Sequence, residues 1–192
     1  VDREDFFLFV GRLVPYKRPH VAASAARRAG TRLVVVGDGR MRAAVEAAGG
    51  PGVEVLGSVD HDTLLGLYRR CQALVFPGEE DFGIVPVEAQ ACGTPVLARG
   101  VGGVRDTVIP GVTGTLYPAT NADDEVDSLA RAMQAFDATA FESTIVRAHA
   151  EQFGHEAFRS SFTAAVGPLL ERRDNTRRTV RRMVPSDPVG GR

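Results

Sequence analysis

The chain contains little cysteine, no tryptophan and no excess of either charge. Its two cysteines, Cys71 and Cys92, have no CxxC partner and no histidine at the spacing of zinc ligands. We therefore expect two reduced, buried thiols and a cytoplasmic protein. The 23 Lys and Arg residues are balanced by 24 Asp and Glu residues, so the composition gives no electrostatic case for a nucleic-acid partner.

Long apolar runs and a secretion signal are also missing. No run approaches the roughly 20 apolar residues of a membrane-spanning helix, and residues 1–5 are acidic rather than signal-like. These absences predict a soluble chain that is not secreted. The 192 residues, 44% of them hydrophobic, suffice for one compact domain. Because the sequence lacks an initial Met and enters an apolar segment at once, we expect an upstream domain to be missing. A one-domain native protein is the alternative.

Short apolar segments alternate with amphipathic ones over the first 118 residues, which is typical of an α/β fold. Near-continuous apolar strands suit a parallel sheet buried on both faces, at 6–10, 32–36, 53–56, 73–76, 95–98 and 115–117. Helices are expected between them at 19–29, 40–48, 61–70, 85–92 and 103–108. Pro19 and Pro86 fit first helical turns, and Gly30 and Gly93 fit left-handed C-caps. The pattern predicts a Rossmann-like, doubly wound sheet of about six strands, which binds ligands at the carboxyl ends of its strands.

Beyond residue 118 only helices are expected, at 122–136, 138–152 and 155–172, with Asn121 and Asp137 as N-caps. We predict a Rossmann-like core at 1–118, helices at 119–173 that pack on it or reach back to a missing half, and a disordered basic tail at 174–192. Residues 172–182 contain six arginines and one acid. A weak peripheral contact with anionic lipid at the inner face of the membrane is one interpretation of this segment, and a solvated end is the other.

Two loops that follow strands carry the chemistry. The first begins at Gly11 and places Arg12, Lys17 and Arg18 just before a helix N-terminus. Backbone amides, the helix dipole and fixed cations favour an anion such as a diphosphate at this place. The alternative is that these cations are solvated surface charges.

The second loop follows the fourth strand and contains two carboxylates. Glu80 lies on the loop and Glu88 in the expected first turn of the next helix, with seven residues between them. Carboxylates at this place accept hydrogen bonds from adjacent sugar hydroxyls. Compensation of the helix dipole by Glu88 is the alternative.

At these positions the sequence resembles glycosyltransferase family 4, over about residues 6–117. The resemblance is carried by the Gly-Arg-Leu loop with Lys17, by the two glutamates with Phe-Gly between them, and by Glu88-Ala-Gln-Ala-Cys-Gly-Thr-Pro-Val. Gly102-Gly103 and Gly111-Val-Thr-Gly114 add to it. It implies one half of a GT-B enzyme, the C-terminal Rossmann-like domain, which binds a nucleotide sugar and transfers the sugar with retention of configuration.

The resemblance also implies roles for single residues. Arg12 and Lys17 would bind the diphosphate and stabilise the leaving group, and Glu88 would bind the ribose. Glu80 would hold the donor sugar together with the backbone of a segment that includes Phe82, Gly83, Ile84 and Val85. The main chain near Ser58 and Val59 would meet the base, and Gly11 opens the diphosphate loop. We expect Arg12, Lys17 and Glu80 to be the catalytic residues, with no metal ion and no cofactor besides the substrate.

Two positions depart from the family's pattern, and two further segments resemble other ligand-binding motifs. Asp81 stands where the family commonly has Gly, and Asp106 where Glu often follows the glycine pair. Asp60-His61-Asp62 has the form of a metal-binding Asp-x-Asp, but Asp60 as an N-cap is the favoured interpretation. Residues 37–42 begin like a dinucleotide fingerprint, yet Arg42 replaces its third glycine.

The favoured function is a hexosyltransferase domain, mannosyltransferase-like, with GDP-mannose preferred over a UDP-hexose. The acceptor, a glycan or a lipid-linked molecule, would be bound by a missing N-terminal domain, so the isolated fragment is expected to be inactive. A sugar-nucleotide epimerase of the same architecture and a non-catalytic nucleotide-binding module are the alternatives.

Overall fold

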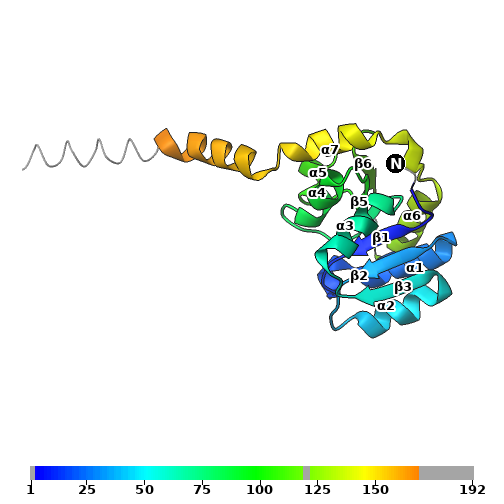
Figure 1. Ribbon diagram of the computed structural model, residues 1–192. Coiled ribbons are helices and arrows are strands. Elements are labelled where there is room, and N and C mark those ends of the chain that lie inside the picture. Colours follow the sequence, from blue (N-terminus) through cyan, green and yellow to red (C-terminus); the bar gives the residue numbers. More distant parts are fainter. Residues whose placement is uncertain (1–2, 119–121, 169–192) are drawn as a thin grey trace, which may run out of the picture. The chain divides into compact units, whose positions relative to one another are not determined.

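A computed structural model describes residues 3–118 and 122–168 and has six strands that form one parallel sheet (Figure 1). In chain order the strands are β1 (Phe7–Val10), β2 (Leu33–Val36), β3 (Val53–Gly57), β4 (Leu74–Phe76), β5 (Val96–Arg99) and β6 (Gly114–Tyr117). The predicted α/β class and the number of strands are confirmed. All six lie within about one residue of their predicted bounds.

The helices that link the strands begin and end close to the predicted residues. They are α1 (Pro19–Ala29), α2 (Arg42–Gly49), α3 (His61–Arg70), α4 (Ile84–Ala91) and α5 (Val104–Thr107), with a short 3-10 helix η1 (Pro15–Lys17) before α1 and η2 (Gly50–Gly52) after α2. Pro19 is the first residue of α1, and Gly30 ends that helix with φ 70°. Proline and glycine therefore mark the two ends of α1, as the sequence predicts.

The strand order is β3-β2-β1-β4-β5-β6, so the direction of winding reverses between β1 and β4. Leu8 of β1 pairs with Leu74 of β4 across this point. In open α/β sheets the loops at the carboxyl ends of two such strands separate and leave a crevice for ligands. The loops that follow β1 and β4 are the two that carry the candidate residues.

Alternate strand residues supply two apolar layers, one on each face of the sheet. Phe7, Phe9 and Val35 belong to the layer formed with α1, α2 and α6 (Ala122–Gln134), whereas Leu8 and Val36 belong to the layer formed with α3, α4 and α5. Burial on both faces explains why the strands are apolar at nearly every position. It also fixes the height of the loops above the sheet.

The predicted helix 138–152 is confirmed over residues 143–151 and is wrong at its start, residues 138–142. A 3-10 helix, η3 (Ala138–Ala140), is followed by an extended Phe141 and then by α7 (Ser143–Glu151). The Phe141 ring stacks on Phe136 at a centroid distance of 5.3 Å, and the Ser143 hydroxyl accepts a hydrogen bond from Arg3 at 3.1 Å. These contacts favour an interrupted chain over a continuous helix. Asp137 is a cap as predicted, but of η3, since its side chain accepts from the Thr139 amide.

The chain divides into two compact units, residues 1–151 and 152–192. In the first unit α6 packs on α1, and α7 packs on α4. The second is helical over its described part from residue 155 to 168. The predicted N-cap Asn121 and the predicted tail 174–192 lie outside the described residues, so the lipid contact stays a prediction. Within the described part of the chain, no helix has the length and apolar character needed to span a membrane.

Candidate functional site

The candidate residues come from loops at the carboxyl ends of β1, β3 and β4. Parallel strands place their carboxyl ends at one edge of the sheet, and β1 and β4 are neighbours. The loop after β1 leads through η1 into α1, and the loop after β4 leads into α4. Both helix N-termini therefore lie at this edge, where their dipoles favour an anion.

Lys17 and Glu80 lie side by side at this edge of the sheet. The Lys17 ammonium donates to Glu80 Oε1 at 2.5 Å, and the side chains are 14% and 21% exposed. Lys17 Nζ also lies 5.7 Å from the centroid of the Tyr16 ring. The structure thus brings together the cation assigned to the diphosphate and the carboxylate assigned to the sugar. A half-buried cation beside a carboxylate can bind an anion and a hydroxyl group at adjacent points.

The loop after β1 is held by close backbone packing. The Gly11 amide donates to the Val36 carbonyl at 3.0 Å, and a Cβ at Gly37 would lie 2.0 Å from the Gly11 carbonyl oxygen. Any residue larger than glycine at position 37 would push the loop out of place. Gly37 therefore has a structural role in placing the loop that begins at Gly11, and Arg12, which follows Gly11, is exposed.

The loop after β4 is supported by the glycine pair that follows β5. The Gly103 amide donates to the Glu80 carbonyl at 2.8 Å. A Cβ at Gly103 would meet the Asp81 carbonyl oxygen at 2.3 Å, and one at Gly102 would meet the Glu80 carbonyl oxygen at 2.6 Å. The pair thus allows two loops to touch through their backbones, which positions Glu80.

Large apolar side chains surround the start of α4 and are open to solvent. Phe82 is 45% exposed and Ile84 65%, whereas Val85 is half-buried. Gly83 precedes the helix with φ 80°, a conformation that few other residues adopt. Exposed apolar groups beside a charged pair suit a ligand that has both charged and carbon-rich faces.

Glu88 lies further from the N-terminus of α4 than predicted. The helix begins at Ile84, so Glu88 is in its second turn, where compensation of the dipole is weak. Its Oε2 accepts a hydrogen bond from the Tyr68 hydroxyl at 3.3 Å. Burial, and then the charge of Glu88, raise the pKa of Tyr68, so Tyr68 stays a donor. Sequence reasoning missed Tyr68, which reads as an apolar residue of α3.

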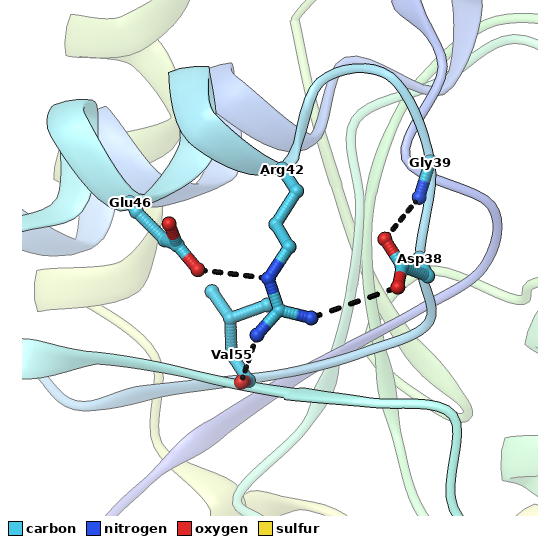
Figure 2. Close-up of polar contacts among 5 residues, drawn as sticks. All are labelled: Asp38, Gly39, Arg42, Glu46 and Val55. Carbon is cyan, nitrogen blue, oxygen red and sulfur yellow. Dashed lines mark hydrogen bonds and ion pairs between the residues drawn. The ribbon is translucent and has the colours of Figure 1, made fainter.

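Ser58 and Val59 follow β3, and an arginine that the sequence interpretation set aside lies behind them. Figure 2 shows Arg42 at the centre of a polar cluster: it donates to Glu46 at 2.9 Å and to the Val55 carbonyl at 3.3 Å. Asp38 lies 3.7 Å from the same guanidinium and accepts from the Gly39 amide at 2.7 Å (Figure 2). A Cβ on Gly57 would lie 3.3 Å from Arg42. Arg42 therefore joins the loop after β2 to the strand that leads to Ser58.

The Asp-x-Asp pattern is part of a helix start. Asp60 Oδ1 accepts from the Thr63 amide at 2.8 Å, as an N-cap does, and this bond, together with that from the Thr63 hydroxyl, lowers the pKa of Asp60. The prediction of an N-cap is confirmed. No group of three His, Cys, Asp or Glu side chains in the described ranges could hold a metal ion.

The chain matches the family model described as glycosyl transferases group 1 over residues 1–138. It is 34% identical over 190 residues to a D-inositol 3-phosphate glycosyltransferase of Mycolicibacterium paratuberculosis. That match covers 92% of this chain and 43% of the relative. The chain therefore spans less than half the length of this curated relative.

Solved structures with the same fold include AviGT4, a glycosyltransferase involved in avilamycin A biosynthesis. It superposes with a TM-score of 0.71 at 26% identity, over 89% of this chain and 53% of AviGT4. The sucrose-phosphate synthase of Thermosynechococcus elongatus superposes with a TM-score of 0.69 at 30% identity, over 88% and 46% of the two chains. Each similarity covers about half of the larger protein.

Proposed function

Because the chain belongs to the group 1 glycosyl transferases and has the Rossmann-like fold of one half of a GT-B enzyme, we propose that it binds the sugar nucleotide of a retaining hexosyltransferase. The observation that carries this proposal is the Lys17–Glu80 pair at the crevice between β1 and β4. The two helix N-termini at this crevice and the pair together suit a diphosphate linked to a sugar.

The proposed donor lies across the carboxyl edge of the sheet. Ser58 and Val59 contact its base, Glu88 its ribose, and Lys17 with Arg12 its diphosphate. Glu80 and the backbone at residues 82–84 hold the sugar. The order of strands supports this arrangement, because the three loops lie along one edge in the order base, diphosphate and sugar.

During transfer the bond from the anomeric carbon to the diphosphate breaks, and negative charge grows on the leaving oxygen. Lys17, Arg12 and the N-terminus of α1 are positioned before the reaction and stabilise that charge as it forms. Because these groups need no reorganisation, they lower the barrier to transfer. Glu80 orients the sugar through its hydroxyls. The acceptor is a glycan or a lipid-linked molecule bound by another part of the full-length enzyme, so the chain alone does not transfer sugar.

GDP-mannose is the donor we propose, and the support for it is the resemblance of residues 82–93 to mannosyltransferases of the family. A UDP-hexose is the competing donor. The two differ in the base, which would meet the loop at Ser58, and in the sugar, which would meet the loop at Glu80. Titration with both nucleotides therefore decides between them.

Isothermal titration calorimetry with GDP, UDP, GDP-mannose and NAD tests the proposal. One nucleoside diphosphate should bind selectively, and Lys17→Ala and Glu88→Ala should each weaken it about tenfold or more, because each removes a charge-assisted contact. Arg70→Ala, which breaks an exposed ion pair with Glu4 away from the crevice, is the control. Binding of NAD alone, or equal affinity in the Lys17→Ala variant, would contradict the proposal.

A further inference from the structure

A cluster of charged side chains, buried at Glu125 and exposed at Glu79, connects the two loops that carry Lys17 and Glu80. It consists of Arg18, Glu79, Arg99 and Glu125, and we call it the Glu125 cluster. Glu125 lies on α6 and is 3% exposed. Arg18 Nη1 donates to its Oε2, and Arg99 Nε lies 3.6 Å from its Oε1. A single buried carboxylate therefore faces two guanidinium groups.

Each arginine leads to a neighbour of a donor-site residue. Arg18 follows Lys17 directly in the sequence. Arg99 Nη1 lies 3.7 Å from Glu79 Oε2, and Glu79 precedes Glu80. The loop after β1 and the loop after β4 are thus connected to the same carboxylate through adjacent residues. No other described carboxylate has ion pairs to both sides of the crevice.

The backbone at Arg18 needs such support. Arg18 has φ 53° and ψ 43°, and it is the single non-glycine residue with positive φ among those described. Arg18 is the C-cap of η1 and the N-cap of α1, so its conformation sets the angle between η1, which ends at Lys17, and α1. Residues other than glycine persist in this conformation when their surroundings hold them there. The contact with Glu125 is one such restraint.

The centre of the cluster and the neighbouring Tyr117 hold several buried polar atoms. Glu125 Oε1, Arg99 Nε and Nη1 and the Tyr117 hydroxyl are buried atoms without a hydrogen-bond partner among the described residues. A stability role alone does not explain this arrangement, because a buried ion pair is at best weakly stabilising compared with apolar residues of the same size. Geometric restraint of the two loops is a use that such a group can have.

We propose that Glu125 is a positioning residue of the donor site, which sets the distance between Lys17 and Glu80 through Arg18 and Arg99. This inference rests on the proposed function, since it assigns Glu125 to the binding of the diphosphate sugar. Glu125 itself does not touch the donor. Its effect reaches the site through the backbone of the two loops.

The sequence offers a direct probe of this effect, because Lys17 is its one lysine. Protein labelled with [ε-¹³C]lysine gives a single ε signal, which reports the surroundings of the Lys17 ammonium. In Glu125→Gln this signal should shift without any ligand, because the Lys17–Glu80 contact changes. Asp127→Asn is the matched control, since Asp127 lies on the same helix and pairs with Arg28 on the surface. It should leave the signal in place.

Nucleotide titration gives the second readout. Glu125→Gln should raise the Kd for GDP or UDP, whichever the wild-type chain binds, by roughly tenfold. The Kd for the matching nucleoside should stay within about twofold, because neither the loop after β3 nor Glu88 on α4 is part of the cluster. Loss of a negative charge acts in the other direction and would tighten binding of a diphosphate. A positioning role of Glu125 therefore predicts a higher Kd in Glu125→Gln, whereas the loss of charge alone predicts a lower one.

An unchanged or lower Kd for the diphosphate, or an unmoved Lys17 signal, would overturn the proposal. Equal weakening of nucleoside and diphosphate would also overturn it, since that is the result of a general structural role. If Glu125→Gln does not fold, Glu79→Gln tests the same connection from its exposed end, with an expected rise of about threefold. A wild-type chain that binds neither nucleotide would refute the proposed function instead. If the affinity for the diphosphate depends on Lys17 and not on Glu125, this inference alone is refuted.

Discussion

Replacing Glu80 by glutamine should tighten the binding of a free nucleoside diphosphate and weaken that of the nucleotide sugar. In the unliganded chain Glu80 holds the Lys17 ammonium at 2.5 Å, so a diphosphate must compete with a carboxylate for this cation. Glutamine keeps the shape of the side chain but removes the competing charge. The sugar, in contrast, loses a charged acceptor for its hydroxyls.

The burial of the pair sets the magnitudes. Side chains that are 14% and 21% exposed are still screened by solvent, so we take about 1 kcal/mol for the lost competition. This corresponds to roughly fivefold tighter diphosphate binding. Glutamine still accepts a hydrogen bond as a neutral group, so each sugar hydroxyl loses the difference between a charged and a neutral acceptor, about 1–1.5 kcal/mol. The ratio of the Kd values for nucleotide sugar and diphosphate should therefore rise at least about fivefold.

Calorimetry with both ligands at one low ionic strength measures this ratio. Asp81→Asn is the control, because Asp81 is an exposed acid on the same loop and its loss changes the net charge by the same amount. Equal changes in the Kd of both ligands in Glu80→Gln, or the same change of ratio in Asp81→Asn, would mean that only the overall electrostatic field of the chain had changed. The assignment of Glu80 to the sugar would then be refuted.

Three further outcomes follow from single contacts. Gly103→Ala should reduce nucleotide affinity at least about tenfold, since its Cβ would meet the Asp81 carbonyl oxygen at 2.3 Å and move the loop. Gly66→Ala is the control: a Cβ there meets no atom within 4 Å, so this variant should raise the Tm of the helix-bearing chain. Equal nucleotide affinities in the two variants would contradict the reasoning. Tyr68→Phe removes the hydrogen bond to Glu88 and should weaken a ribonucleotide by about fivefold while leaving a 2′-deoxy analogue nearly unaffected, which competition titration measures. Burial lowers the pKa of His20, so the folded chain resists protonation of this residue. In denaturant melts the free energy of unfolding should fall as the pH drops below about 6.5, the unfolded pKa, and should level off below the folded pKa. A His20→Gln variant with the same pH profile would exclude this histidine as the cause.

The sheet and most of its helices could be predicted because local signals determine them. Apolar strands and terminal prolines and glycines depend on neighbouring residues alone. The break at Phe141 could not be predicted in this way, because it depends on stacking with Phe136 and on a hydrogen bond from Arg3. Contacts between distant residues outweigh helix periodicity at that point.

The candidate site follows the same division. Lys17 and Glu80 could be located from their places after strands, and the roles assigned to them stay predictions. Glu125 was missed because it reads as an ordinary charged residue of an amphipathic helix, and Arg42 was noted only as the residue that replaces the third glycine of a dinucleotide fingerprint. For Arg42, acids four residues away on both sides were a usable signal. For Lys17, the usable signal was its position as the chain's one lysine within a loop that begins with glycine.

The reversal of winding between β1 and β4 divides the chain as well as the sheet. Strands β1 to β3 occupy residues 7–57, and β4 to β6 occupy residues 74–117, so each half of the sheet is one uninterrupted stretch of sequence. In the proposed arrangement the earlier stretch recognises the base and the diphosphate, and the later one recognises the ribose and the sugar. A single genetic crossover near residue 72 would therefore exchange one half of the sheet, with its part of the proposed donor site, for that of another protein.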